Sequence, residues 1–191
     1  MPPTPSTVRA AQAAAALAAL AALFAAGCGG GERVRPIASL APFALRLSSP
    51  DFADGARLPR RVTCDGDSAS PALRWSRPPP RTRELALVVD DPDAPRGTFA
   101  HWLVYGLPRS DRGLPAGTKP ATLRLGKTSS GKVGYEPPCP PKGDDAHRYV
   151  FTLYALRAPL GLPYGAEAKR VRDAIARRAI ARGRLTGRYS R

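Results

Sequence analysis

The sequence predicts a mainly β protein, an antiparallel β-sandwich with one C-terminal helix. Between residues 43 and 154, short apolar segments are separated by proline, glycine and aspartate, a pattern typical of strands joined by turns. The 191 residues include 22 prolines, which suit loops and sheet edges and oppose a largely helical fold. Only one segment, near the C-terminus, has the apolar spacing of a helix.

Four segments are predicted as strands. In residues 43–49, FALRLSS, apolar and polar side chains alternate, which places Phe43 on the same face as Leu45 and Leu47. Two further segments are short runs rich in β-branched and aromatic residues, and a last one alternates again. These three predicted strands are residues 84–91, 101–108 and 147–156.

The helix is predicted from Ala166 to Ala181, where apolar residues recur at i, i+3 and i+4 and basic residues occupy the other face. Gly183 is expected to cap its C-terminus. We interpret the basic face as a solvated surface. The last residues, 184–191, are expected to form a short strand or a tail.

The N-terminus has the features of a secretory signal over residues 1–27. One positive charge, Arg9, precedes an uncharged Ala/Leu run that ends in small residues before Cys28. This end resembles a bacterial lipobox, in which Cys28 carries the lipid, although leucine is usual where Ala25 stands. The alternative is an uncleaved membrane anchor, which is less favoured because an alanine-rich run is only marginally apolar.

The remaining chain is predicted to be a tether over residues 28–42 and a single folded domain over residues 43–191. The tether contains three glycines and no apolar periodicity. The domain has the length of one ordinary folded unit. The predicted location is therefore extracytoplasmic, with the protein held to the cell membrane by the lipid on Cys28.

The net charge of +15 raises the question of a nucleic-acid partner. We predict none, because the arginines are scattered and the protein is expected to be exported. Attraction to anionic lipid headgroups or cell-surface polymers is the more natural consequence. A bias toward arginine throughout the organism's proteins is the alternative explanation.

Cysteine and histidine supply the other functional signals. Cys64 and Cys139 are predicted to form a disulfide, as an oxidising compartment allows, and two buried free thiols are the alternative. His101 and His147 each lie at the mouth of a predicted strand, and Asp91 precedes the first. If the mouths adjoin, imidazole donors oriented by a carboxylate would hold a small anion such as phosphate.

Several motifs resemble the phosphatidylethanolamine-binding protein family, in its bacterial branch labelled Raf kinase inhibitor-like. They are DPDAP, HWLVYGLP and GYEPPCPPKGDDAHRYVFTLYAL, together with RVTCDGDSASPALRWSRPP and the C-terminal ARGRLTGRYSR. The resemblance covers essentially everything from Phe43 onward. It implies a Greek-key β-sandwich with a small anion pocket at one end. We predict neither a cofactor nor a metal.

The resemblance also implies the residues of that pocket. Asp91 and His101 would lie at its base, with Asp93 holding the turn that follows Asp91. One departure is Pro137, which has no N–H and stands where the family usually has glycine in the anion-binding loop. The complete implied ligand-binding set is Asp91, Ala94, Pro95, Phe99, His101, Tyr135, Pro141, His147 and Tyr149.

Three functions are weighed. The leading prediction is a binding module for phosphate, phosphoethanolamine or a related headgroup. The alternative is an inhibitor that binds a protease or kinase, so that another envelope protein would be its partner. A phosphoester hydrolase using Asp91 and His101 is less favoured, because no GxSxG nucleophile motif is present and the histidine spacing fits no metal motif.

Overall fold

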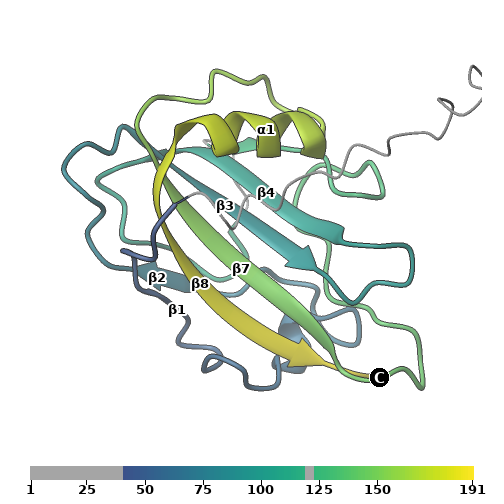
Figure 1. Ribbon diagram of the computed structural model, residues 1–191. Helices are drawn as coiled ribbons and strands as arrows, with labels where there is room; N and C mark the ends of the chain where they lie inside the picture. Colours follow the sequence, from purple (N-terminus) through teal and green to yellow (C-terminus); the bar gives the residue numbers. More distant parts are fainter. Residues whose placement is uncertain (1–40, 119–122) are drawn as a thin grey trace, which may run out of the picture. The chain divides into compact units, whose positions relative to one another are not determined.

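The computed structural model describes residues 41–118 and 123–191 (Figure 1). They belong to a unit that begins at Pro36. The predicted signal at 1–27, the predicted lipidation site Cys28 and nearly all of the predicted tether at 28–42 lie outside the described residues.

Two antiparallel sheets form the fold, so the prediction of a mainly β protein is confirmed. In the large sheet the strand order is β6-β4-β3-β7-β8, and in the small sheet it is β1-β2-β5. The large sheet contains β3 (Glu84–Asp91), β4 (Phe99–Pro108), β6 (Arg124–Leu125), β7 (His147–Leu156) and β8 (Ala179–Tyr189). The small sheet contains β1 (Leu47–Ser48), β2 (Leu73–Trp75) and β5 (Gly113–Leu114), and a short 3-10 helix, η2 (Arg60–Val62), lies between β1 and β2.

The large sheet is buried on both faces. Its inner face contributes Trp102, Tyr149 and Phe151 to a core shared with Leu73 and Trp75 of the small sheet. Its outer face is crossed by helix α1 (Ala168–Arg178), as Figure 1 shows. Because β3 lies in the middle of this arrangement, its residues 85–89 form a continuous apolar run instead of an alternating one.

A second core fills the space between α1 and the outer face. Val171 and Ile175 of α1 are fully buried there. They belong to one cluster with Val88, Leu103 and Tyr105 of the sheet. The apolar stripe that predicted the helix is therefore the face that covers the sheet.

The predicted C-terminal end of the helix is wrong. The helix ends at Arg178, Ala179 is already extended, and β8 pairs with β7 from Ala179 to Tyr189. Gly183 lies inside this strand and is not a cap. A Cβ at Gly183 would lie 2.6 Å from the Leu45 carbonyl oxygen, so this position requires glycine because another chain segment passes very close.

The first predicted strand is also shorter than expected. Leu45 and Leu47 are buried, but Phe43 is 58% exposed. Residues 42–45 run along the free edge of β8, where the amides of Ala44 and Leu45 donate to the Arg182 carbonyl. Residues 55–58 cover the rest of that edge through bonds to β8. The segment therefore protects an edge strand, which would otherwise expose unpaired backbone groups.

Candidate functional site

The ends of three neighbouring strands meet at one edge of the large sheet. Strand β3 lies between β4 and β7 and is antiparallel to both, so its last residues lie beside the first residues of its neighbours. Asp91 ends β3, His147 begins β7, and His101 is the third residue of β4. All three side chains are buried.

A β-bulge directs His101 toward the inner face. Val89 pairs with Trp102 and Asp90 pairs with Ala100, which leaves His101 as the extra residue of β4. Two consecutive side chains can therefore turn inward, Trp102 into the core and His101 against the ring of Tyr149. Bulges of this kind are common next to functional sites because they re-aim a side chain.

The Asp91 carboxylate is held by both of its oxygens. Oδ2 accepts a hydrogen bond from His147 Nδ1 at 2.8 Å, and Oδ1 accepts one from the Asp93 amide at 2.8 Å. The first bond fixes the His147 ring with Nδ1 protonated, so that Nε2 is the nitrogen left for a ligand. Asp144 Oδ2 lies 3.7 Å from that Nε2.

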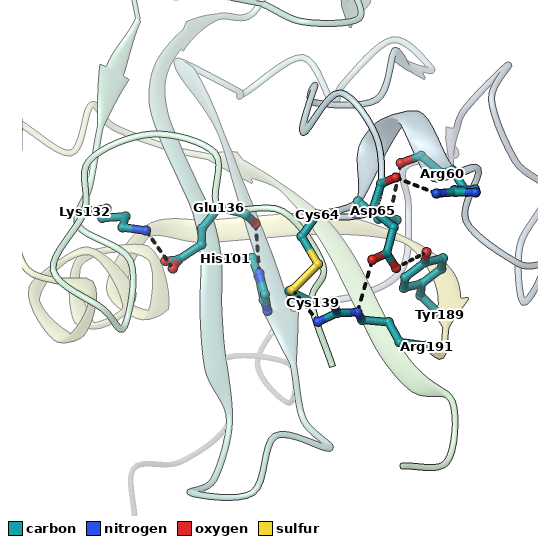
Figure 2. The surroundings of a disulfide bond; sticks show 10 residues. Arg60, Cys64, Asp65, His101, Lys132, Glu136, Cys139, Tyr189 and Arg191 are labelled. Atoms are coloured by element: carbon teal, nitrogen blue, oxygen red, sulfur yellow. Dashed lines mark hydrogen bonds and ion pairs between the residues drawn. A yellow bond between two sulfur atoms is a disulfide. The ribbon is translucent and has the colours of Figure 1, made fainter. Parts of the chain in front are cut away.

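His101 is oriented by the backbone of Glu136 (Figure 2). Its Nδ1 lies 2.9 Å from the Glu136 carbonyl oxygen, and the Glu136 amide donates to the His101 carbonyl at 2.9 Å. Because a carbonyl only accepts, Nδ1 carries the proton and Nε2 can face a ligand. Burial lowers the pKa of His101, so the ring is neutral at pH 7.

Tyr149 places a hydroxyl beside these groups. Its ring meets His101 edge-on at 5.2 Å, and the ring of Phe99 packs on His101 at 4.7 Å. The Tyr149 hydroxyl is buried and donates to no group within residues 41–118 and 123–191, while the Cys139 backbone amide faces its oxygen. Burial, with the carboxylates of Asp91 and Asp93, raises the pKa of Tyr149, so the hydroxyl keeps its proton and acts as a donor.

The loop from residue 135 to 141 borders the site and is tied down at several points. The predicted disulfide is confirmed: Cys64 and Cys139 are bonded, and the Cys64 amide donates to the Pro138 carbonyl at 3.0 Å (Figure 2). Tyr135 donates its hydroxyl to the Val62 carbonyl at 2.7 Å and packs edge-on against Trp102. Tyr135 therefore holds the loop in place and directs its polar group away from a ligand.

The other residues implied by the resemblance lie in the loops around this edge. Ala94 and Pro95 are in the turn between β3 and β4, which the Gly97 amide closes by donating to the Ala94 carbonyl. Pro141 is exposed at the end of the 135–141 loop. Pro137 lies in the same loop and has no backbone N–H to offer.

The structure corrects the expected role of Asp93. Asp91, not Asp93, holds the turn, since it accepts the Asp93 amide. Asp93 instead accepts three bonds from Arg148, from its amide, Nε and Nη2, at 2.8, 2.9 and 2.6 Å. The hydrogen bond from the Arg148 side chain lowers the pKa of Asp93 to about 2.

Sequence reasoning missed three contributors to the site: the bulge in β4, the Glu136 carbonyl and Arg148. Each depends on strand register or on a backbone group, which carries no residue-type signal.

An open recess beside the site adds further charges. It is lined by Asp93, Asp144, Asp145, Ala146, His147, Arg148 and Arg188.

Two further features of the described residues bear on the kind of site. Within the described ranges, no group of three His, Cys, Asp or Glu side chains is arranged to hold a metal ion. None of the helices in the described part of the chain is long and apolar enough to span a bilayer.

Comparison with known proteins gives a consistent result. A family model described as "Phosphatidylethanolamine-binding protein" matches residues 48–190. The "Putative lipoprotein LppC" of Mycobacterium tuberculosis is 40% identical over 180 residues, covering 85% of this chain and 88% of that protein. A "UPF0098 protein" of Aquifex aeolicus is 39% identical over 152 residues, covering 77% of this chain and 89% of that protein.

Two crystal structures share the fold. One, from Chlamydia trachomatis, is described as a "Putative PhosphatidylEthanolamine-Binding Protein (PEBP) Homolog". It has a TM-score of 0.72 at 34% identity and covers 80% of this chain and 99% of that one. The other is YbcL of E. coli, described as a member of the mammalian PEBP family. It has a TM-score of 0.73 at 28% identity and covers 77% of this chain and 98% of that one.

Proposed function

The chain belongs to the phosphatidylethanolamine-binding protein family, in its bacterial branch, and from this premise we propose that it is an extracytoplasmic lipoprotein that binds a small phosphorylated anion. The ligand is phosphate, phosphoethanolamine or a related headgroup. The binding groups are Tyr149, His101 and the Asp91–His147 pair.

The observation that carries the proposal is the buried hydroxyl of Tyr149, which donates to no group in the described residues. A buried donor without a partner costs about 1–3 kcal/mol, and such groups are rare unless a ligand or a bound water completes them. A phosphoryl oxygen next to this hydroxyl would also be within reach of the His101 ring, which touches Tyr149. The site thus offers the Tyr149 hydroxyl as a donor beside two oriented imidazole rings, whose Nε2 atoms can donate to a ligand only when they carry a proton.

The charges of the binding groups determine in which protonation state a phosphoryl group can bind. Asp91 holds His147 and His101 is neutral, so the empty pocket provides no net positive charge of its own. A phosphoryl dianion therefore gains a donor from His101 only when Nε2 takes up a proton. A singly protonated phosphoryl group can instead donate its own O–H to the bare Nε2. Binding therefore involves one proton in both cases, which is either taken up by His101 Nε2 or brought by the phosphoryl group.

Binding fits this chemistry better than catalysis. Ser129 Oγ accepts from the Ala100 amide at 2.8 Å, and Ser130 Oγ donates to the Glu136 carboxylate at 2.8 Å. Neither hydroxyl is paired with a histidine base, as a serine nucleophile requires. Tyr149 keeps its proton and is a poor nucleophile.

The extracytoplasmic location has three supports. Cys28 follows a signal-like segment, a relative is described as a lipoprotein, and the Cys64–Cys139 disulfide suits an oxidising compartment. Mass spectrometry of protein from the native membrane tests this part of the proposal. We expect an N-terminal peptide that begins with acylated Cys28, and an unmodified, uncleaved N-terminus would overturn it.

Two tyrosine variants test the pocket. Calorimetry with phosphate and phosphoethanolamine is made on residues 28–191, with Cys28→Ser to prevent lipidation. Tyr149→Phe is expected to weaken binding by at least about tenfold, because a hydrogen bond to a charged ligand is lost. It should not lower the free energy of unfolding of the ligand-free protein, and should raise it by up to about 1–3 kcal/mol, because the buried hydroxyl that it removes donates no hydrogen bond in the described structure.

Tyr135→Phe is the matched control. It also removes one phenolic hydroxyl, but that hydroxyl donates to the Val62 carbonyl. We expect it to cost about 1–2 kcal/mol of stability and to leave phosphate binding intact. Equal affinity in the wild type and Tyr149→Phe would exclude the proposed pocket.

A further inference from the structure

An exposed aromatic ring lies beside the edge strand β8, where residues 42–45 meet the large sheet. Phe43 and Tyr164 are the exposed large hydrophobic residues of the described chain, at 58% and 63%. Phe43 forms a bridge with Arg182 of β8. The guanidinium carbons of Arg182 and Arg184 lie 4.0 and 5.5 Å from the centre of its ring. The ring thus lies over two arginines at the edge of β8.

More arginines lie at the same end of the sheet. Arg157 follows β7, and its side chain donates to the Arg177 carbonyl at the end of α1, at 2.8 Å. Arg177 and Arg184 are both exposed. We call Phe43, Arg157, Arg177, Arg182 and Arg184 the Phe43 patch. Two of its four cationic side chains, those of Arg182 and Arg184, lie against the exposed ring of Phe43.

The carboxylates around the Phe43 patch are engaged elsewhere. Glu84, at the start of β3, is buried and accepts the Leu160 amide. Asp90 is paired with Arg172, and Asp54 accepts the Thr186 amide further along β8. Arg182 Nε and Nη1 are buried beside the Phe43 ring, whereas Arg177 and Arg184 are exposed and present their charge to solvent. The positive charge of the patch is therefore available to an outside anion.

We propose that the Phe43 patch rests on the anionic surface of the membrane to which Cys28 is attached. The inference goes beyond the anion pocket and rests on the lipidation of Cys28 in the proposed function. Fifteen residues lead from Cys28 to Phe43, which span at most roughly 50 Å. The tether therefore lets the patch reach lipid phosphates, where each arginine contributes about 1 kcal/mol.

The residue types match an interfacial contact. An aromatic ring sits favourably at the boundary between headgroups and acyl chains, while arginine bonds phosphate in a forked geometry. A basic patch often accompanies a lipid anchor as a second membrane contact. Tethering makes such a weak contact effective because it raises the effective concentration of the patch at the bilayer surface.

Vesicle binding tests the inference without the lipid anchor. Residues 28–191 carrying Cys28→Ser are titrated with vesicles of phosphatidylcholine alone, and of equal parts phosphatidylcholine and phosphatidylglycerol. We expect binding only to the anionic vesicles, weakened by added salt. Arg184→Gln should weaken it about fivefold. Phe43→Ser should also weaken it.

The matched control is Arg74→Gln, which removes the same charge from the exposed face of β2 in the small sheet. It should change vesicle binding less than twofold. An equal effect of both arginine variants, or no binding to anionic vesicles, would overturn the inference. So would loss of binding in His101→Ala, because the pocket would then be capturing headgroups. Phosphate calorimetry on the same proteins tests the pocket separately.

Discussion

At the scale of single residues, His101 makes anion binding depend on pH. Burial places its pKa below the ordinary value when the pocket is empty, and a bound anion raises it again. Between these two pKa values, binding takes up a proton, so affinity falls as pH rises. Sulfate is a suitable probe because its charge is constant from about pH 5.5 to about pH 7.5, where histidine titrates.

We expect sulfate affinity to fall by up to about tenfold per pH unit across this range. His101→Gln removes the titrating group while keeping a side chain of similar size, and should make the profile flatter. Calorimetry at several pH values measures both proteins. A wild-type affinity that does not change with pH would show that His101 exchanges no proton on binding.

Asp93 and Arg148 provide a second residue-scale prediction, this time for stability. The Asp93 pKa falls from 3.8 to about 2 in the folded protein, so its contribution is present above about pH 4 and is lost as pH falls toward 2. The pair is partly exposed, at 30% and 50%. We therefore expect Asp93→Asn to cost only about 1 kcal/mol.

Urea unfolding of both proteins tests this expectation. The difference between wild type and Asp93→Asn should be present at neutral pH, should be small at pH 2, where the wild-type carboxylate is about half protonated, and should vanish below that pH. A difference that persists at acid pH would mean that Asp93 acts through packing and not through its charge.

At the scale of elements, the disulfide joins the 135–141 loop to the segment after η2. Its cysteines are 75 residues apart, and the chain-entropy model assigns about 4 kcal/mol to a loop of that length. Cys64→Ser with Cys139→Ser should lose stability on this scale. Phosphate affinity should fall as well, because the loop carries the Glu136 carbonyl that orients His101.

Denaturant unfolding and calorimetry separate these two effects. The effect on the pocket is the difference in phosphate affinity between the double variant and the wild type, measured under conditions where both are fully folded. Unchanged phosphate affinity in the folded double variant would show that the loop keeps its position without the disulfide.

The same scale shows how far sequence can predict structure. Strands β3, β4 and β7 were predictable because each has its own apolar pattern. The start of β8 was not, since AIARG consists largely of good helix formers and becomes a strand only by pairing with β7. The site followed from the motif resemblance around Asp91, His101 and His147. The bulge in β4 and the contact between His101 and the Glu136 carbonyl could not be predicted from the sequence, because both depend on how strands and loops meet.

At the scale of the whole domain, the pocket and the Phe43 patch lie at opposite ends of β7. His147, in the pocket, pairs with Tyr189, whereas Tyr154 pairs with Arg182 of the patch. Seven residues of strand separate them, which is roughly 23 Å. If the patch rests on the bilayer, the pocket is held well away from the headgroups beneath it.

The two sites should therefore act independently, and the pocket should take phosphorylated molecules that have left the bilayer or never belonged to it. We expect the lipidated protein on anionic vesicles to bind phosphate with the affinity measured in solution, within about twofold, because the patch and pocket share no residue. Hydrogen exchange on the vesicles should protect residues 41–46 and the first half of β8, while the amides around His101 and Cys139 keep their solution rates. Loss of phosphate affinity on vesicles, or protection centred on the 135–141 loop, would mean instead that the pocket itself faces the membrane and draws its ligand from the bilayer.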